Sequence, residues 1–351
     1  MFKILQKLRV ALDNMKSVLK WRIDSGSTFD VYYEKWDRLN ESGPNSPVLN
    51  AAFVSCALKA FGCHGKIIAI LESDSKVMAM AILEKNKLGV WDTYQPSQAP
   101  LGFWINQSQE PLAKLLKSLA KALPGIVLKI GLTQQDPDIY PRPKDENNIS
   151  TLDYIDTARV YVEGSFDEYW ASRGKNLRHN LKRQRNRLRK ENIETKLQSI
   201  TDPDFVYDAV ISYGTLESAG WKSEQGTAIH SSNDQGKFYI SLLSSFCSRG
   251  KGIIYQYTYN NRIVASDICI EQGGTFVILK TTYDEEIKTS SPAFLMRQEV
   301  FERLFNETNV SSIEFYGKVM DWHSKWSSDI RKMYHLNYDR LKWRRNSRNV
   351  G

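Results

Sequence analysis

The sequence predicts a mixed α/β (α+β) protein with two similar domains in tandem, each a mostly antiparallel sheet flanked by helices. The chain has 351 residues, enough for about two domains. Each half repeats one order of patterns: helices, then three β-rich runs joined by short turns, then a helix and another strand. We therefore expect domains over residues 1–150 and 151–351, the first of them potentially a degenerate copy.

The first half gives these elements in order. Helical patterns cover 1–22 (amphipathic and basic), 28–39, 46–61 and 109–123, and β-rich runs cover 66–71, 76–83, 87–93, 126–130 and 151–162. Ser42-Gly43-Pro44 ends the second helix, and Pro124-Gly125 ends the last one. Because residues 136–148 contain three prolines and four acids, they are expected to form an exposed connection between the halves.

The second half opens with a strongly basic helix over 171–191. Further helices are expected over 203–219, 236–248 and 291–305, and strands over 252–259, 262–271, 275–283 and 312–316. Asn260-Asn261 and Gly273-Gly274 are typical of tight hairpin turns between antiparallel strands.

Composition excludes several classes of protein. Hydrophobic residues make up 41% and charged residues 25%, as in ordinary globular proteins. No apolar run approaches the roughly 20 residues needed to cross a bilayer, and the N-terminus lacks the pattern of a secretory signal. The four cysteines are scattered without paired spacing, and the five histidines suggest no metal cage. We expect a cytoplasmic protein without a metal, either free or at the inner face of a membrane.

The positive charge is concentrated in one segment. The net charge is +8, but nine basic residues and no acid lie between Arg173 and Lys190, which leaves 39 basic against 40 acidic residues elsewhere. Leu177, Leu181 and Leu188 form a narrow apolar stripe on this helix. Such a surface suits coenzyme A, a nucleotide-linked sugar, RNA such as tRNA, or an anionic membrane, and a solvated helix face without a ligand is the alternative. DNA is not expected as a partner. The basic cluster over 340–348 is interpreted as a solvated tail.

A strand followed by a helix start is a candidate anion site. The strand over 275–283 is followed by Ser290-Ser291-Pro292, where serine suits the N-cap and proline the first turn. Free amides and the positive end of the helix dipole bind diphosphates, although such helix starts occur in most α/β proteins.

Five motifs then appear in a fixed order along the chain. They are the basic stretch 175–190, then Glu217 with Gly220-Trp221-Lys222 and 226–229, then Tyr283-Asp284-Glu285 with Ser291-Pro292, then Phe315-Tyr316-Gly317, and finally 322–326. Together they resemble the CelD/BcsL-type acetyltransferases of the GNAT superfamily, tandem-GNAT proteins related to the FemAB-type transferases and often linked with polysaccharide biosynthesis. The resemblance covers about residues 28–335 and implies acyl transfer from acetyl-CoA or another acyl-CoA in the second domain.

The resemblance also implies where the cofactor would bind. Its tail would pass between parted central strands, and its diphosphate would meet the helix start. The implied cofactor residues are Tyr283, Ser290, Ser291, Ala293 and Phe294. Two departures occur. Ala293 stands where the family commonly has glycine, and Trp322-His323 stands where it commonly has Tyr-Lys, so that Lys325 or, more weakly, His323 would have to supply the missing cation.

Acyl transfer to an amine or hydroxyl needs a base within reach of the nucleophile and a donor to the developing oxyanion. The candidate bases are, in order, Glu217, Asp284 and Asp267. A terminal salt bridge is the alternative role of Glu217 and a turn cap that of Asp284, whereas burial in an apolar strand is expected to raise the pKa of Asp267. Expected substrate contacts are Trp221, Lys222, Arg178, Lys182, His323 and Lys325.

Three functions remain open at this point. The first is an acyl-CoA-dependent N- or O-acyltransferase acting on a sugar, a nucleotide-linked sugar or an envelope-polysaccharide precursor. The second is a FemAB-like transferase that takes its acyl group from aminoacyl-tRNA. The third is a non-catalytic module that binds RNA or a membrane surface through the basic helix.

Overall fold

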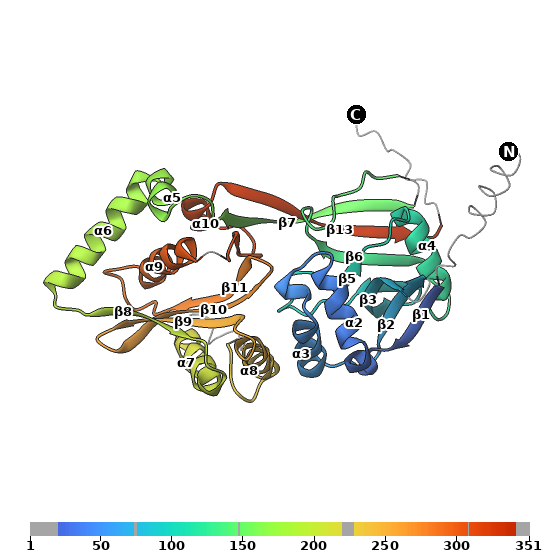
Figure 1. Ribbon diagram of the computed structural model, residues 1–351, viewed down its shortest axis with the longest axis horizontal. Coiled ribbons are helices and arrows are strands. Elements are labelled where there is room, and N and C mark those ends of the chain that lie inside the picture. Colours follow the sequence, from blue (N-terminus) through green and yellow to red (C-terminus); the bar gives the residue numbers. More distant parts are fainter. Residues whose placement is uncertain (1–19, 74–75, 147, 220–227, 308, 342–351) are drawn as a thin grey trace, which may run out of the picture.

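The computed structural model describes residues 20–73, 76–146, 148–219, 228–307 and 309–341. Figure 1 shows an elongated molecule of two lobes, each formed mainly by one half of the chain, with helix α6 (Lys175–Lys190) at the outer end of the second lobe. None of the helices in the described ranges is long and apolar enough to cross a membrane.

The first half contains the expected strands and helices in order, together with two short strands, over 20–25 and 104–106, that were not expected. They are β1 (Lys20–Ser25), α2 (Phe29–Glu41), α3 (Ala51–Phe61), β2 (Lys66–Ser73), β3 (Lys76–Lys87), β4 (Val90–Thr93), β5 (Trp104–Asn106), α4 (Leu112–Ala122), β6 (Lys129–Gln135) and β7 (Ile149–Tyr161). Short 3-10 turns cover Gly26–Thr28 and Pro47–Leu49.

The second half follows the same plan after two helices. Its elements are α5 (Phe166–Ser172), α6 (Lys175–Lys190), β8 (Thr195–Ile200), a 3-10 turn (Pro203–Phe205), α7 (Val206–Ser218), α8 (Asp234–Cys247), β9 (Gly252–Tyr259), β10 (Arg262–Gln272), β11 (Thr275–Tyr283), α9 (Pro292–Asn306), β12 (Ser312–Glu314), α10 (His323–Trp326) and β13 (Asp329–Asp339).

One sheet runs through both lobes. Its strand order is β1-β2-β3-β4-β6-β13-β7-β12-β11-β10-β9-β8, and β5 pairs with β3 beside this path. All neighbours are antiparallel except β4 with β6 and β11 with β12, which are parallel and occupy corresponding places in the two halves. The predicted fold class, mixed α/β with a mostly antiparallel sheet flanked by helices, is confirmed.

The last strand joins the two halves. β13 pairs with β6 on one side and with β7 on the other, and β7 in turn pairs with β12. The end of the chain therefore completes the sheet beside strands of the first half, and the domain boundary expected between residues 150 and 151 stays a prediction.

Helices cover both faces of the sheet, and the cores beneath them explain why. On one face, α2, α3, α7 and α8 enclose a core continuous across the lobes, in which the rings of Phe53 and Phe238 meet at 5.4 Å. On the other face, α5, α6, α9 and α10 cover the second lobe, and α4 covers the first. The apolar stripe of α6 is buried as predicted, through Leu177, Leu181 and Leu188.

Several expected boundaries are wrong. Residues 20–22 belong to β1 rather than to the basic N-terminal helix, whose residues 1–19 lie outside the described ranges, as does most of the basic tail. The helix expected over 171–191 is divided, because α5 ends at Ser172 and α6 begins after Gly174. A capping box between Ser165 and Glu168 starts α5, a signal that the sequence carries in plain form.

Candidate active site

Strands β11 and β12 part after a short stretch of pairing. Only Thr275–Val277 of β11 pairs with Ser312–Glu314 of β12, while β11 continues to Tyr283. The pairing of β10 with β11 shifts so that Leu279 is the extra residue, just where β12 leaves. Because a bulge bends its strand and interrupts the ladder, it accounts for the divergence.

A cavity of about 830 Å³ lies at this parting. Residues from α7, β11, the turn before α9, α9 itself and the segment before α10 line it, including Tyr283, Ser290, Ser291, Ala293 and Phe294. The structure thus brings all five expected cofactor residues together around one cavity. Its volume falls in the range of roughly 300–1,000 Å³ typical of small-molecule sites.

The start of α9 differs from the sequence expectation in one respect. Pro292 occupies the first turn as predicted, but the side chain of Ser291 makes no capping bond. Instead, the Ser291 N–H donates to Gln184 Oε1 of α6 at 2.9 Å, and Gln184 Nε2 donates to Ser291 Oγ at 3.4 Å. The expected serine cap is wrong, because the Ser291 hydroxyl accepts from Gln184 Nε2 instead of from the amides of the first turn.

Glu217 lies at the C-terminal end of α7 and lines the cavity. Its side chain is 0% exposed, and Oε1 lies 2.9 Å from Lys280 Nζ. The second oxygen accepts the Ile229 N–H at 3.0 Å. The carboxylate is thus held in place by a cation and a backbone donor, at the wall of the cavity.

Asp284 and Asp267 take structural positions instead. Asp284 accepts the Glu286 N–H at 2.9 Å, which is the turn-capping role, and pairs with Arg262. Asp267 is fully buried, and both of its oxygens lie 3.3 Å from Arg297 Nη2. Neither carboxylate lines the cavity, whereas Glu217 does.

Arg297 of α9 is a residue that the sequence analysis missed. It is 3% exposed, lines the cavity, donates to Thr281 Oγ1 at 2.8 Å and lies 4.8 Å from the centre of the Trp322 ring. An arginine in the apolar run of α9, together with an aspartate in the apolar run of β10, was the available signal. A buried charge of each sign in neighbouring elements predicts a pair.

His323 does not supply a cation. Burial, the larger cause, and the nearby charge of Arg297 together lower the pKa of His323 to about 4, so the ring is neutral at neutral pH. Its Nδ1 accepts the Met320 N–H at 3.0 Å, and the ring stacks on Trp322 at 3.5 Å. The expectation of a charged His323 is therefore wrong.

The other expected substrate contacts lie in different places. Lys325 Nζ is 5.4 Å from the centre of the Phe294 ring, at a second cavity of about 620 Å³ that shares Ser291 and Phe294 with the first. Arg178 and Lys182 lie on another flank of α6 and line a third cavity. Trp221 and Lys222 fall outside the described residues.

Comparison with known proteins identifies the class of this domain. Residues 175–324 match the family model described as "Acetyltransferase (GNAT) domain". This segment is a GNAT acetyltransferase domain, and the protein is an acyltransferase. The match contains α6, the parted strands and the whole of α9. No curated protein matches the chain.

Solved structures show the same fold over most of the chain. A C-terminal domain of a putative lysylphosphatidylglycerol synthetase from Agrobacterium fabrum aligns with a TM-score of 0.57 at 12% identity, over 88% of this chain and 92% of that chain. FemX aligns with a TM-score of 0.57 at 10% identity, over 88% and 96%. L-PGS from Bacillus licheniformis aligns with a TM-score of 0.51 at 14% identity, over 87% and 90%. At these identities the likeness is one of fold.

In the first half, β4 and β6 form the parallel pair that corresponds to β11 and β12, but residues of the first half fill the space where these two strands diverge. β4 and β6 pair only over Val90–Asp92 and Lys129–Gly131. Gly102 then lies between the diverging ends, where its N–H donates to the Thr133 carbonyl at 3.2 Å. A Cβ at Gly102 would stand 2.4 Å from Thr93 Oγ1, so no space remains beside it. In the described residues, the open GNAT-type parting is that of the second half.

Proposed function

We propose that this acyltransferase takes its acyl group from acetyl-CoA or another acyl-CoA and transfers it to an amino or hydroxyl group. The proposed acceptors are a sugar, a nucleotide-linked sugar or an envelope-polysaccharide precursor, as in the CelD/BcsL-type enzymes that the motifs resemble. The single observation that carries the proposal is the cavity of about 830 Å³ beside the end of β11 that no longer pairs with β12, which extends to the start of α9. We further propose a cytoplasmic location, with or without attachment to the inner face of the membrane.

The proposed cofactor position follows from backbone groups. Beyond Val277, β12 no longer pairs with β11, so the backbone groups on that edge of β11 can bind the amide-containing arm of coenzyme A as they would bind an added strand. At the start of α9, Phe294 and Leu295 donate their N–H groups to the Ser291 carbonyl, and Ser291 donates to Gln184. The Ala293 amide and the helix dipole are left for the diphosphate, and Lys288 at the same cavity adds a positive charge.

We propose Glu217 as the general base because it alone of the three candidate carboxylates lines the cavity. The acceptor's nitrogen or oxygen attacks the thioester carbon while its proton passes to Glu217, the carbon–sulfur bond breaks, and the proton then passes to the departing thiolate. A backbone N–H on the parted edge of β11 would stabilise the oxyanion. Lys280 holds the carboxylate in place beforehand.

A matched pair of variants tests the cofactor site. Ala293→Asp places a negative charge in the first turn of α9, which the helix dipole tolerates but a diphosphate does not. Ala293→Asn has nearly the same shape without the charge. We expect calorimetric titration to give saturable acetyl-CoA binding for the natural chain and for Ala293→Asn, and at least about tenfold weaker binding for Ala293→Asp. Equal binding by both variants would exclude this position for the diphosphate.

The catalytic step is tested separately, by release of the coenzyme A thiol in the presence of candidate acceptors. Glu217→Gln keeps an oxygen that can accept the Ile229 N–H but cannot take a proton. We expect a fall in kcat of about 10²- to 10⁴-fold with acetyl-CoA binding unchanged. A variant with normal turnover would remove Glu217 from the mechanism.

A second candidate donor is aminoacyl-tRNA, and the observation that favours it is the basic surface of α6. On α6, Arg185 pairs with Glu299 and Arg187 pairs with Glu191. The other cations of this helix form no salt bridge with the described residues, so they can contact phosphates. Binding of tRNA would weaken steeply with salt. Tight tRNA binding without saturable acyl-CoA binding would favour this donor over the first.

A further inference from the structure

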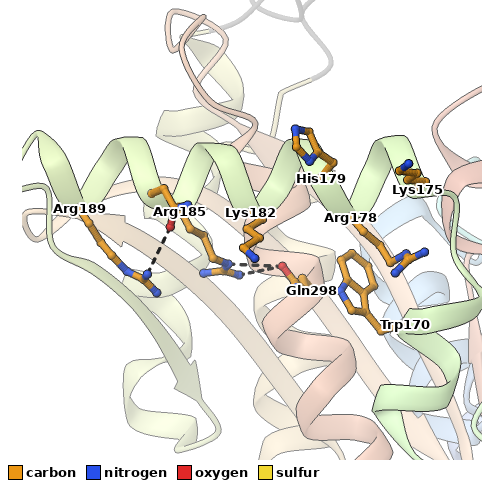
Figure 2. Close-up of a pocket in the computed structure, with 9 residues that line it drawn as sticks. Trp170, Lys175, Arg178, His179, Lys182, Arg185, Arg189 and Gln298 are labelled. Carbon is orange, nitrogen blue, oxygen red and sulfur yellow. Dashed lines mark hydrogen bonds between the residues drawn. The ribbon is translucent and has the colours of Figure 1, made fainter.

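A groove of about 520 Å³ lies between α5, α6 and α9, apart from the cavity at the parted strands. Figure 2 shows its lining along one flank of α6. Trp170 of α5, Gln298 of α9 and four arginine or lysine residues of α6 (Arg178, Lys182, Arg185 and Arg189) are among the lining residues. In all, five lining residues are lysine or arginine, and no acidic side chain lines the groove.

The charge of this groove is only partly balanced by the protein. Arg185 is a structural anchor, since it pairs with Glu299 at 2.6 Å and donates to the Leu295 carbonyl at 3.2 Å. For Arg178, Lys182 and Arg189, the described residues provide no salt bridge. Cations gathered in one concave site repel one another, and a bound anion relieves that repulsion.

Two of the lining side chains are held in position before any ligand binds. The Arg178 Nε–H donates to the Arg173 carbonyl at 3.0 Å, which fixes the stem and leaves the two terminal nitrogens directed elsewhere. Trp170 stacks on Phe166 at 6.0 Å with an angle of 11° between the rings. The groove therefore presents a preset guanidinium together with an aromatic wall.

The shape of the surface favours a discrete ligand over a membrane. The volume suits a small molecule of nucleotide size. Peripheral membrane helices bury large apolar side chains in the lipid, whereas the large exposed hydrophobic residues of the described chain all lie outside α5 and α6. A phosphorylated small molecule needs only the few cations that the groove offers.

We infer that this groove binds a nucleoside diphosphate, as the anionic part of the acceptor. Arg178, Lys182 and Arg189 contact the two phosphates, and Trp170 forms the wall beside the ring system. The description of this ligand as an acceptor rests on the proposed transferase function, but the binding itself does not. Gln298 of the groove and Arg297 of the cofactor cavity are neighbours on α9, so the two sites flank the same helix.

The experiment is calorimetric titration of the full chain with UDP, ADP, inorganic pyrophosphate, inorganic phosphate and coenzyme A. The test variant is the double substitution Arg178→Gln with Lys182→Gln. Its charge-matched control is Arg183→Gln with Lys190→Gln, on the same helix but outside the groove lining. We expect the test variant to raise the Kd for UDP or ADP at least about tenfold and the control to change it less than about threefold.

The other titrations test which ligand the groove prefers and whether coenzyme A binds elsewhere. We expect nucleoside diphosphates to bind more tightly than pyrophosphate, and the Kd for UDP to be unchanged when coenzyme A is saturating. Equal losses in both double variants would reduce the effect to general charge, and the inference would fall. Competition between UDP and coenzyme A, or binding of a random RNA oligonucleotide without binding of UDP or ADP, would overturn it as well.

These outcomes are separable from failure of the proposed function. If the groove inference alone is wrong, acetyl-CoA still binds and is still blocked by Ala293→Asp. If the transferase proposal alone is wrong, UDP or ADP binds and depends on Arg178 and Lys182, while acetyl-CoA does not bind.

Discussion

The ion pair between Asp267 and Arg297 gives the sharpest test of how the second lobe is held together. Asp267 on β10 is 0% exposed and Arg297 on α9 is 3% exposed, so each charge depends on the other in a dry environment. Removing one partner leaves a buried charge without compensation, which costs about 3–5 kcal/mol. We therefore expect Asp267→Leu and Arg297→Met each to lower the free energy of unfolding by about this amount.

The double variant is expected to behave differently. Once both charges are replaced by apolar side chains, no buried charge remains, and such replacements are often neutral or stabilising. The loss of the Arg297 bond to Thr281 at 2.8 Å and of its contact with Trp322 offsets part of this gain. We expect the double variant to lie within about 2 kcal/mol of the natural chain, well below the sum of the single losses.

The assay is urea unfolding followed by tryptophan fluorescence and circular dichroism. Arg187→Met is the control, since Arg187 and its partner Glu191 are 52% and 42% exposed and the loss of this pair should cost less than about 1 kcal/mol. If the two single losses simply added in the double variant, or if each stayed below about 1 kcal/mol, buried-charge compensation would not explain the pair.

Three further predictions concern other parts of the chain. The folded protein holds the pKa of His323 at about 4 against 6.5 normally, so its contribution to stability is complete above pH 6.5 and is lost as the pH falls toward 4. His323→Asn keeps an acceptor for the Met320 amide but cannot be protonated. Thermal unfolding should therefore show that, between pH 7 and 4, the free energy of unfolding of this variant falls by about 3 kcal/mol less than that of the natural chain. Equal falls in both proteins would refute burial of neutral His323 as the cause. Gly102→Ala should lower the unfolding free energy by about 1–3 kcal/mol, because the new Cβ meets Thr93 and Thr133, while leaving acetyl-CoA affinity unchanged; a stable variant would show that the first-half parting can widen. A chain ending at residue 328 lacks β13 and should lose the amide-exchange protection of β6 and β7 together. If these strands kept their protection, the halves would fold independently of β13 and the prediction would be wrong.

Local sequence patterns were sufficient for most elements. The alternation of helical and β-rich runs predicted both halves, and the turns Asn260-Asn261 and Gly273-Gly274 adopt positive φ angles as tight hairpin turns require. β13 was missed, because Arg331 and Lys332 interrupt its alternation. Arg331 is buried against Asp136 at 2.6 Å, a partner 195 residues away that no local pattern reveals.

The residues of the candidate site were also only partly predictable from the sequence. Residues near the start of α9 were found because proline and serine mark a helix start, and the cavity gathers them. The three carboxylates could not be ranked from sequence, since each has a cationic partner and the sequence does not tell which of them lines the cavity. Arg262 and Arg297 occupy Asp284 and Asp267, and both arginines come from elements whose approach depends on the sheet.

Helix α6 connects the two sites in physical terms. Its outer flank lines the basic groove, while Gln184 on another flank binds the Ser291 amide at the start of α9. While Gln184 occupies that amide, the Ala293 amide is left for the diphosphate, so Gln184 limits the number of donors at the helix start. Gln184→Ala would free the amide as a further donor, and we expect calorimetric titration to give tighter acetyl-CoA binding and an unchanged Kd for UDP; an unchanged acetyl-CoA affinity would show that the diphosphate does not use this amide.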